Sequence, residues 1–264
     1  MTTASRKTIS SALAVVGVGL LCAALALPFF RKEVMNPREP RLPEGVDFEG
    51  EILWDRPLPP SPQGVLVLAS GINDRTGALV RMDSWREFAR TRNLALAEAS
   101  FSSPTTTAQC WERGYWHPAL GSGALLEEAL RQEFGDPATC PPLFLFGFSM
   151  GGNFVYEFQQ MTQYPVAAWT VLGRSILAPE DNSRPVAPAL LLCGEMETGV
   201  QRSHEEYLQD IRGRGQDAQL QVIPNAGHQM DERAFDAARV FFQRILREAG
   251  GQQVPPPYNT LPLP

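Results

Sequence analysis

The sequence predicts an α/β fold, with a mostly parallel β-sheet that carries helices on both faces. Three observations lead to this prediction. Short apolar runs bounded by glycine recur along the chain, as in Val65 to Ala69, and such runs are typical of strands buried on both faces. Segments with helical spacing alternate with these runs. A Gly-x-Ser-x-Gly motif, Gly147 to Gly151, joins one apolar run to one helical segment.

The composition suits one globular domain. The chain has 264 residues, of which 44% are hydrophobic and 20% charged, and its formal net charge is −6. This length is enough to bury a full core. The sequence has no basic stripe, so nothing in it indicates nucleic-acid binding.

Residues 1–30 differ from the rest of the chain. Arg6 and Lys7 precede an uncharged, apolar run from Ile9 to Leu27. This pattern predicts a secretory signal peptide, with cleavage after Ala26. The run also approaches the roughly 20 residues that span a bilayer, so an uncleaved N-terminal membrane anchor is the alternative. Both alternatives export the domain, to the periplasm or the extracellular space, and the second attaches it to the membrane.

The remaining chain divides into three parts. Residues 31–62 form a proline-rich lead-in with one strand-like run, 48–54. Residues 63–250 form the main domain, and a proline-rich tail, 251–264, is expected to add nothing to the core. In the main domain, strand-like runs predict strands at 65–69, 94–99, 143–148, 166–172, 189–193 and 219–223. Apolar residues at helical spacing predict helices at 85–92, 124–134, 151–161, 203–212 and 232–248.

The Gly147-Phe148-Ser149-Met150-Gly151 motif predicts a serine nucleophile. A strand-to-helix turn forces the serine into a strained backbone conformation and crowds the positions two before and two after it. Glycine at 147 and 151 relieves that crowding. Ser149 is then held at the carboxyl edge of the sheet.

A serine hydroxyl needs a base that takes its proton. His228 follows the last predicted strand and precedes the last helix, so it is expected at the same sheet edge as Ser149. His117 lies on a connecting loop. His204 opens a predicted helix beside two glutamates, and we expect it to be a solvated surface residue. His228 is therefore the predicted base.

The base in turn needs a carboxylate that fixes its tautomer. The turn after strand 189–193 reads Gly194-Glu195-Met196-Glu197, so it offers two glutamates and no aspartate. Glu197 is favoured because the turn can bring it back to the cleft. Glu195 is the alternative, and its other expected role is to bind backbone groups in the turn.

Backbone N–H groups must meet the charge of a tetrahedral intermediate. Met150, at the helix start, is one expected donor. The other is expected in the loop after the first buried strand, where Gly71 lets the backbone turn and Ile72 is the predicted donor. Asn73 and Asp74 are expected to cap this turn.

The residues in this order resemble the α/β-hydrolase superfamily over Val65 to Ala249. The segment from Cys110 to Trp116 resembles compact secreted esterases related to polyhydroxybutyrate depolymerases and feruloyl esterases. The resemblance implies a serine hydrolase that cleaves small or polymeric carboxylic esters through an acyl-serine intermediate, without a cofactor. Two departures stand out: Ser70-Gly71 replaces a common His-Gly, and glutamate replaces aspartate at Glu197.

The loop from Gly173 to Pro188 is too short for a cap domain, so an open cleft is expected. The predicted substrate-binding residues are Trp111, Tyr115 and Trp116, with Ile176 beside them. A peptidase or acyltransferase on the same fold is one alternative function, and a non-catalytic binding module is another.

Cys110, Cys140 and Cys193 follow the leader, and their spacing makes no metal site. Cys193 is expected in the core, and an oxidising compartment would allow a Cys110–Cys140 disulfide.

Overall fold

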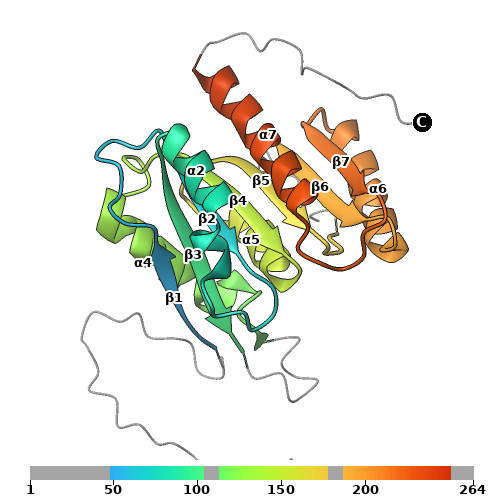
Figure 1. The fold of residues 1–264 in the computed structure, drawn as a ribbon, viewed down its shortest axis with the longest axis horizontal. Coiled ribbons are helices and arrows are strands. Elements are labelled where there is room, and N and C mark those ends of the chain that lie inside the picture. The colour runs from blue at the N-terminus through green and yellow to red at the C-terminus, as the bar shows by residue number, and fades with distance from the viewer. Residues whose placement is uncertain (1–47, 104–112, 178–186, 251–264) are drawn as a thin grey trace, which may run out of the picture. The chain divides into compact units, whose positions relative to one another are not determined.

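A computed structural model of the chain describes residues 48–103, 113–177 and 187–250. These residues contain a seven-stranded sheet with strand order β1-β3-β2-β4-β5-β6-β7 (Figure 1). The strands are β1 (Glu49–Trp54), β2 (Gly64–Ala69), β3 (Leu94–Ser102), β4 (Leu143–Phe148), β5 (Val166–Leu172), β6 (Ala189–Gly194) and β7 (Ala218–Ile223). Only β1 is antiparallel to its neighbour, β3. The predicted mostly parallel sheet is confirmed.

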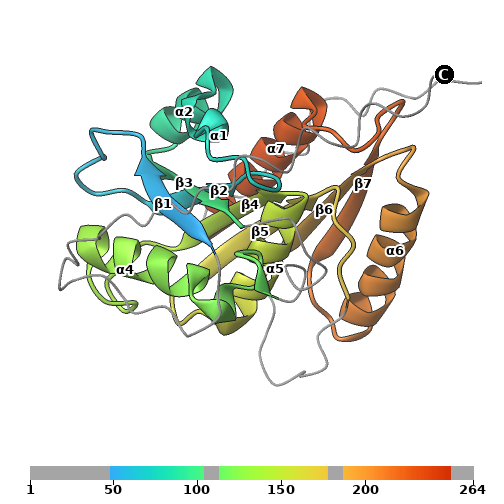
Figure 2. The same ribbon diagram turned by 90° about the horizontal axis from the view of Figure 1, so that it is seen from below.

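Helices cover both faces of the sheet (Figure 2). One face carries α1 (Ala78–Arg81), α2 (Asp83–Thr91) and α7 (Glu232–Ala249). The other carries α4 (Ser122–Phe134), α5 (Met150–Met161) and α6 (Thr198–Gly213), and a 3₁₀ turn, η1 (Pro118–Leu120), precedes α4. Successive strand residues point to opposite faces of the sheet and belong to two hydrophobic cores, one on each face. Val65, Val67 and Leu145 face α5, whereas Leu66 and Phe146 face α7.

Three differences from the predicted elements stand out. The sheet includes β1, which lies in the predicted lead-in, so the folded domain extends to the N-terminal side of residue 63. The helix α6 begins at Thr198 and not at residue 203, and Glu197 is its N-cap residue. The short helix α1 was not predicted at all, because four residues are too few to show helical periodicity.

Several predicted features lie outside the described residues. They are the leader, the proline-rich tail, Cys110 and Trp111. Among the described residues, no helix is long and apolar enough to cross a membrane. Cys193 is fully buried, as predicted, and Cys140 is a buried free thiol. Burial raises the pKa of both thiols to about 11.

Candidate active site

Ser149 lies in a sharp turn between β4 and α5. Its backbone adopts φ 53° and ψ −119°, a conformation that non-glycine residues rarely occupy. The flanking glycines make the turn feasible. A Cβ on Gly147 would lie 2.2 Å from the Gly151 carbonyl oxygen, and one on Gly151 would lie 2.3 Å from the carbonyl oxygens of Ala69 and Ser70. Side chains at both positions are therefore excluded.

Three predicted residues form one hydrogen-bonded line. His228 Nε2 is 3.0 Å from Ser149 Oγ, and His228 Nδ1 is 2.7 Å from Glu197 Oε1. A carboxylate can only accept, so Nδ1 carries the proton and donates it to Glu197. Nε2 is thereby left as the acceptor for the Ser149 hydroxyl. This arrangement allows the imidazole to take the serine proton.

The two glutamates of the acidic turn have different partners. The Glu197 side chain is only 8% exposed, and its second oxygen accepts from the Gly194 N–H at 2.8 Å. Glu195 accepts from the backbone N–H of Asn225 at 2.8 Å, in the loop that carries His228. Glu197 therefore binds the imidazole, and Glu195 binds the backbone of the loop that carries His228.

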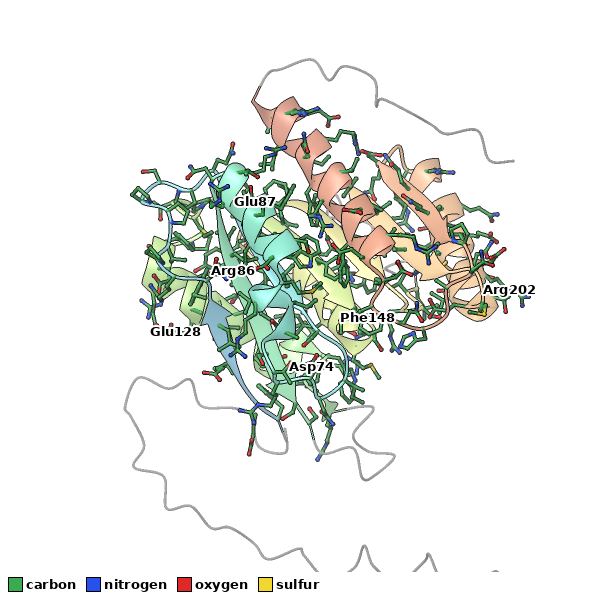
Figure 3. The ribbon with its side chains drawn as sticks, viewed as in Figure 1. Asp74, Arg86, Glu87, Glu128, Phe148 and Arg202 are labelled. Atoms are coloured by element: carbon green, nitrogen blue, oxygen red, sulfur yellow. The ribbon has the colours of Figure 1, made fainter. Side chains whose placement is uncertain are left out.

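Two residues that were not singled out from the sequence touch the His228 imidazole. Phe148 stacks on it, with ring centroids 5.1 Å apart (the position of Phe148 is shown in Figure 3). Gly173 has φ +68°, and a Cβ there would lie 3.1 Å from His228 Nδ1 and 3.3 Å from Glu197 Oε1. A glycine one residue after the end of a buried strand was the available signal for this position.

The loop after β2 lies beside the nucleophile. A Cβ on Gly71 would lie 3.7 Å from the Ser149 Cβ. The buried Tyr115 hydroxyl donates to the Gly71 carbonyl oxygen at 3.0 Å. Since the C=O and N–H of a trans peptide point in opposite directions, the Ile72 N–H points away from Tyr115. The Met150 N–H belongs to the first turn of α5, where N–H groups have no partner within the helix.

Side-chain contacts fix the same loop from its other side. Ser103 donates its backbone N–H to Asn73 Oδ1, and Thr76 donates its own to Asp74 Oδ1. Asp74 thus caps the turn as expected, whereas Asn73 connects the loop to the residue after β3. The buried Glu98 accepts from the Val80 N–H at 2.8 Å, which anchors α1 behind the loop. Burial raises the pKa of the Glu98 carboxyl group.

Two of the three aromatic residues expected to line the cleft, Tyr115 and Trp116, are core residues. Tyr115 is 2% exposed and Trp116 is 1% exposed. The two rings pack edge to face, and Tyr115 also packs on Phe101. Ile176 is buried as well. Their assignment to the substrate-binding surface was wrong, because the sequence does not show which way a loop aromatic points. Tyr115 instead positions the Gly71 carbonyl.

His204 is also placed differently from the prediction. Its ring is fully buried in α6, and Nε2 is 2.8 Å from the Arg174 carbonyl oxygen. Burial lowers the pKa of this imidazole. The buried positions of α6 are 204, 207, 208 and 211, a helical spacing that includes His204. That spacing was the missed signal. His117 is half-buried and pairs with Glu157 at 2.9 Å.

No group of three or more His, Cys, Asp or Glu side chains in the described ranges could hold a metal ion. No family model matches the sequence, and no curated protein sequence matches it.

Comparison with solved structures identifies the fold. Esterase PE8 is 18% identical, with a TM-score of 0.54 over 76% of this chain and 100% of that one. The esterase Est2 of Thermogutta terrifontis is 13% identical, with a TM-score of 0.53 over 81% and 94%. S-formylglutathione hydrolase FrmB of Staphylococcus aureus is 15% identical, with a TM-score of 0.51 over 78% and 100%. On these grounds the chain has the α/β-hydrolase fold, without a large cap among its described residues.

Proposed function

We propose that this chain is a serine hydrolase that cleaves carboxylic esters through an acyl intermediate on Ser149. The observation that carries the proposal is the line from Ser149 Oγ through the His228 imidazole to Glu197. The similar folds of the two esterases also support the proposal. At 18% and 13% sequence identity, this likeness is one of fold alone. A binding module would have no need for a strained serine with an oriented base.

In the proposed reaction, Ser149 Oγ attacks the ester carbonyl carbon while His228 Nε2 takes its proton. Glu197 stabilises the resulting imidazolium. The Met150 and Ile72 N–H groups donate to the oxyanion of the tetrahedral intermediate. The alcohol then leaves with the proton from His228, and water, activated by the same imidazole, releases the acid.

The proposed site needs no cofactor, and the chemistry can be tested with two substrates. We expect the purified protein to hydrolyse 4-nitrophenyl acetate much faster than a peptide 4-nitroanilide, because 4-nitrophenolate leaves more readily than the anilide nitrogen. Equal or faster cleavage of the anilide would favour a peptidase. Transfer of the acetyl group to an added alcohol in preference to water would favour an acyltransferase.

A matched pair of variants tests the acid. Glu197→Gln should lower kcat by at least about a hundredfold, because the neutral amide neither fixes the tautomer nor stabilises the imidazolium. Glu195→Gln should keep kcat within about threefold, since an amide oxygen can still accept from the Asn225 N–H. The reverse result would reassign the acid. Export and membrane attachment of the chain also remain predictions, and fractionation of cells that express the full chain would test them.

A further inference from the structure

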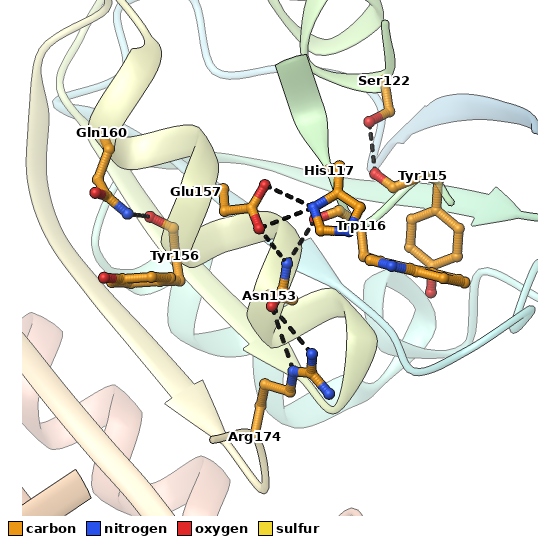
Figure 4. Close-up of polar contacts among 9 residues, drawn as sticks. All are labelled: Tyr115, Trp116, His117, Ser122, Asn153, Tyr156, Glu157, Gln160 and Arg174. Atoms are coloured by element: carbon orange, nitrogen blue, oxygen red, sulfur yellow. Dashed lines mark hydrogen bonds and ion pairs between the residues drawn. The ribbon is translucent and has the colours of Figure 1, made fainter. Parts of the chain in front are cut away.

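A cation beside the proposed active site has no carboxylate partner among the described residues. The half-buried Arg174 directly follows Gly173. Its Nε and Nη2 donate to the amide oxygen of Asn153 at 3.3 and 3.2 Å (Figure 4). In the part of the chain that the structure describes, this guanidinium forms no ion pair. Its Nη1 makes no hydrogen bond to the described residues.

Among the described residues, Glu157 is the carboxylate that acts on the Arg174 charge, and its oxygens are bound to other partners. Glu157 Oε1 accepts from Asn153 Nδ2 at 2.7 Å, and both Glu157 oxygens lie within 3.0 Å of His117 Nδ1. The Asn153 amide therefore stands between the guanidinium and the carboxylate, as Figure 4 shows. A half-buried charge without a direct counter-ion is costly, so this position favours an anion.

The protein holds Arg174 in place from several sides. The His204 imidazole donates to its carbonyl oxygen, and a Cβ on Gly152 would lie 3.1 Å from the Arg174 Cβ. Burial lowers the pKa of the guanidinium, and Glu157 opposes this shift. Because an arginine keeps its proton in proteins, Arg174 is a fixed positive charge. A pre-organised guanidinium suits bidentate binding of a carboxylate.

Arg174 is also linked to the proposed catalytic residues, through its neighbour in the chain and through its hydrogen-bond partner. Its preceding residue, Gly173, lies so close to His228 and Glu197 that a Cβ there would be 3.1 Å from His228 Nδ1 and 3.3 Å from Glu197 Oε1. Its hydrogen-bond partner, Asn153, donates its backbone N–H to the Ser149 carbonyl oxygen at 3.3 Å. One helical turn, about 5.4 Å of rise, separates Ser149 from Asn153. Ser149 and Arg174 follow β4 and β5, which are parallel neighbours, so both residues lie at the same carboxyl edge of the sheet.

We infer that Arg174 binds an anionic group, in the simplest case a carboxylate, on the ester that Ser149 attacks. The inference rests on the proposed function and narrows it to esters that carry a negative charge close to the scissile carbonyl. Arg174 would then determine specificity, since a neutral ester leaves the guanidinium without its counter-ion.

Two substrate pairs test this inference. In the first, the charge is on the acyl side: mono-(4-nitrophenyl) glutarate is compared with its methyl ester. In the second, it is on the alcohol side: 3-acetoxybenzoate is compared with its methyl ester. The readout is the ratio of background-corrected kcat/KM, anionic over neutral. We expect at least one pair to show a ratio of about ten- to a hundredfold, the worth of a charge-assisted hydrogen bond.

Variants assign the preference to Arg174. Arg174→Gln should abolish the ratio, and Arg174→Lys, which keeps the charge, should retain part of it. Arg202 on α6 is exposed (Figure 3) and takes part in none of the contacts described above. Arg202→Gln therefore makes the same charge change as a matched control and should keep the wild-type ratio. A wild-type ratio near one in both pairs, or an unchanged ratio in Arg174→Gln, overturns the inference. In either case, Ser149-dependent hydrolysis of the neutral esters still upholds the proposed function. Absence of Ser149-dependent hydrolysis of every ester overturns both.

Discussion

Phe148 stacks on the imidazole of His228, with ring centroids 5.1 Å apart and an interplanar angle of 29°. Phe148 directly precedes Ser149 and also lies against Gly71 in the loop after β2, so one ring touches the nucleophile turn, the base and the expected oxyanion loop. The His228 side chain is otherwise 51% exposed. The ring therefore limits the orientations of an imidazole that solvent would leave free to rotate.

Replacing the ring should lower activity. We expect Phe148→Leu to reduce kcat toward 4-nitrophenyl acetate by roughly tenfold, because a misplaced base costs more than lost packing. Phe148→Tyr keeps the ring and should retain most of the activity. Steady-state kinetics of the two variants check this. Equal kcat values for Leu and Tyr at this position would mean that stacking does not position His228.

Gly173 should be intolerant of any side chain. In Gly173→Ala the Cβ would press on the His228–Glu197 hydrogen bond, and we expect kcat to fall by at least about tenfold. Gly215 has a similar backbone, φ +71°, but a Cβ there would meet nothing within 4 Å. Both alanines should lower the unfolding free energy by about 1 kcal/mol through backbone strain. Only Gly173→Ala should lose activity, and a parallel loss in Gly215→Ala would refute the steric explanation.

The buried His204 should make stability depend on pH. Its pKa is lowered in the folded state, so the unfolded chain binds the proton more readily. Its contribution to stability is therefore full above the unfolded pKa of about 6.5 and is lost as pH falls through and below that value. The loss is at most about 1.4 kcal/mol per pH unit.

Urea unfolding at pH 7.5, 6.5 and 5.5 would measure this effect. His204→Gln can still donate to the Arg174 carbonyl oxygen but does not titrate, so its stability should fall less between pH 7.5 and pH 5.5 than that of the wild type. Parallel pH profiles for the two proteins would rule out His204 as the titrating group.

Much of the fold follows from local sequence patterns. The strands β4 and β5 have the predicted bounds, because a strand buried on both faces is a continuous apolar run that turns or polar residues interrupt sharply. The start of α6 could not be predicted in the same way. Thr198 to Arg202 lack apolar periodicity, and the helix begins there because the chain turns at Glu197, the N-cap residue.

The candidate site was predictable to the extent that it depends on chain order. Ser149, Glu197 and His228 each follow a strand of the parallel part of the sheet, and parallel strands bring such positions to one edge. The burial of Tyr115 and Trp116 and the approach of Gly173 to His228 depend on tertiary packing between segments far apart in the sequence. No local pattern records such contacts, so they required the structure.

The most direct test of Ser149 as the nucleophile, with His228 as its base, is to locate the site of covalent labelling. Wild-type protein is treated with a fluorophosphonate probe, digested and examined by mass spectrometry, alongside Ser149→Ala and His228→Gln. We expect one modified residue, Ser149, with no labelling of Ser149→Ala and labelling slowed by at least about a hundredfold in His228→Gln. Two results would contradict these roles. One is no labelling of a wild-type protein that circular dichroism shows to be folded, and the other is labelling of His228→Gln as fast as that of the wild type.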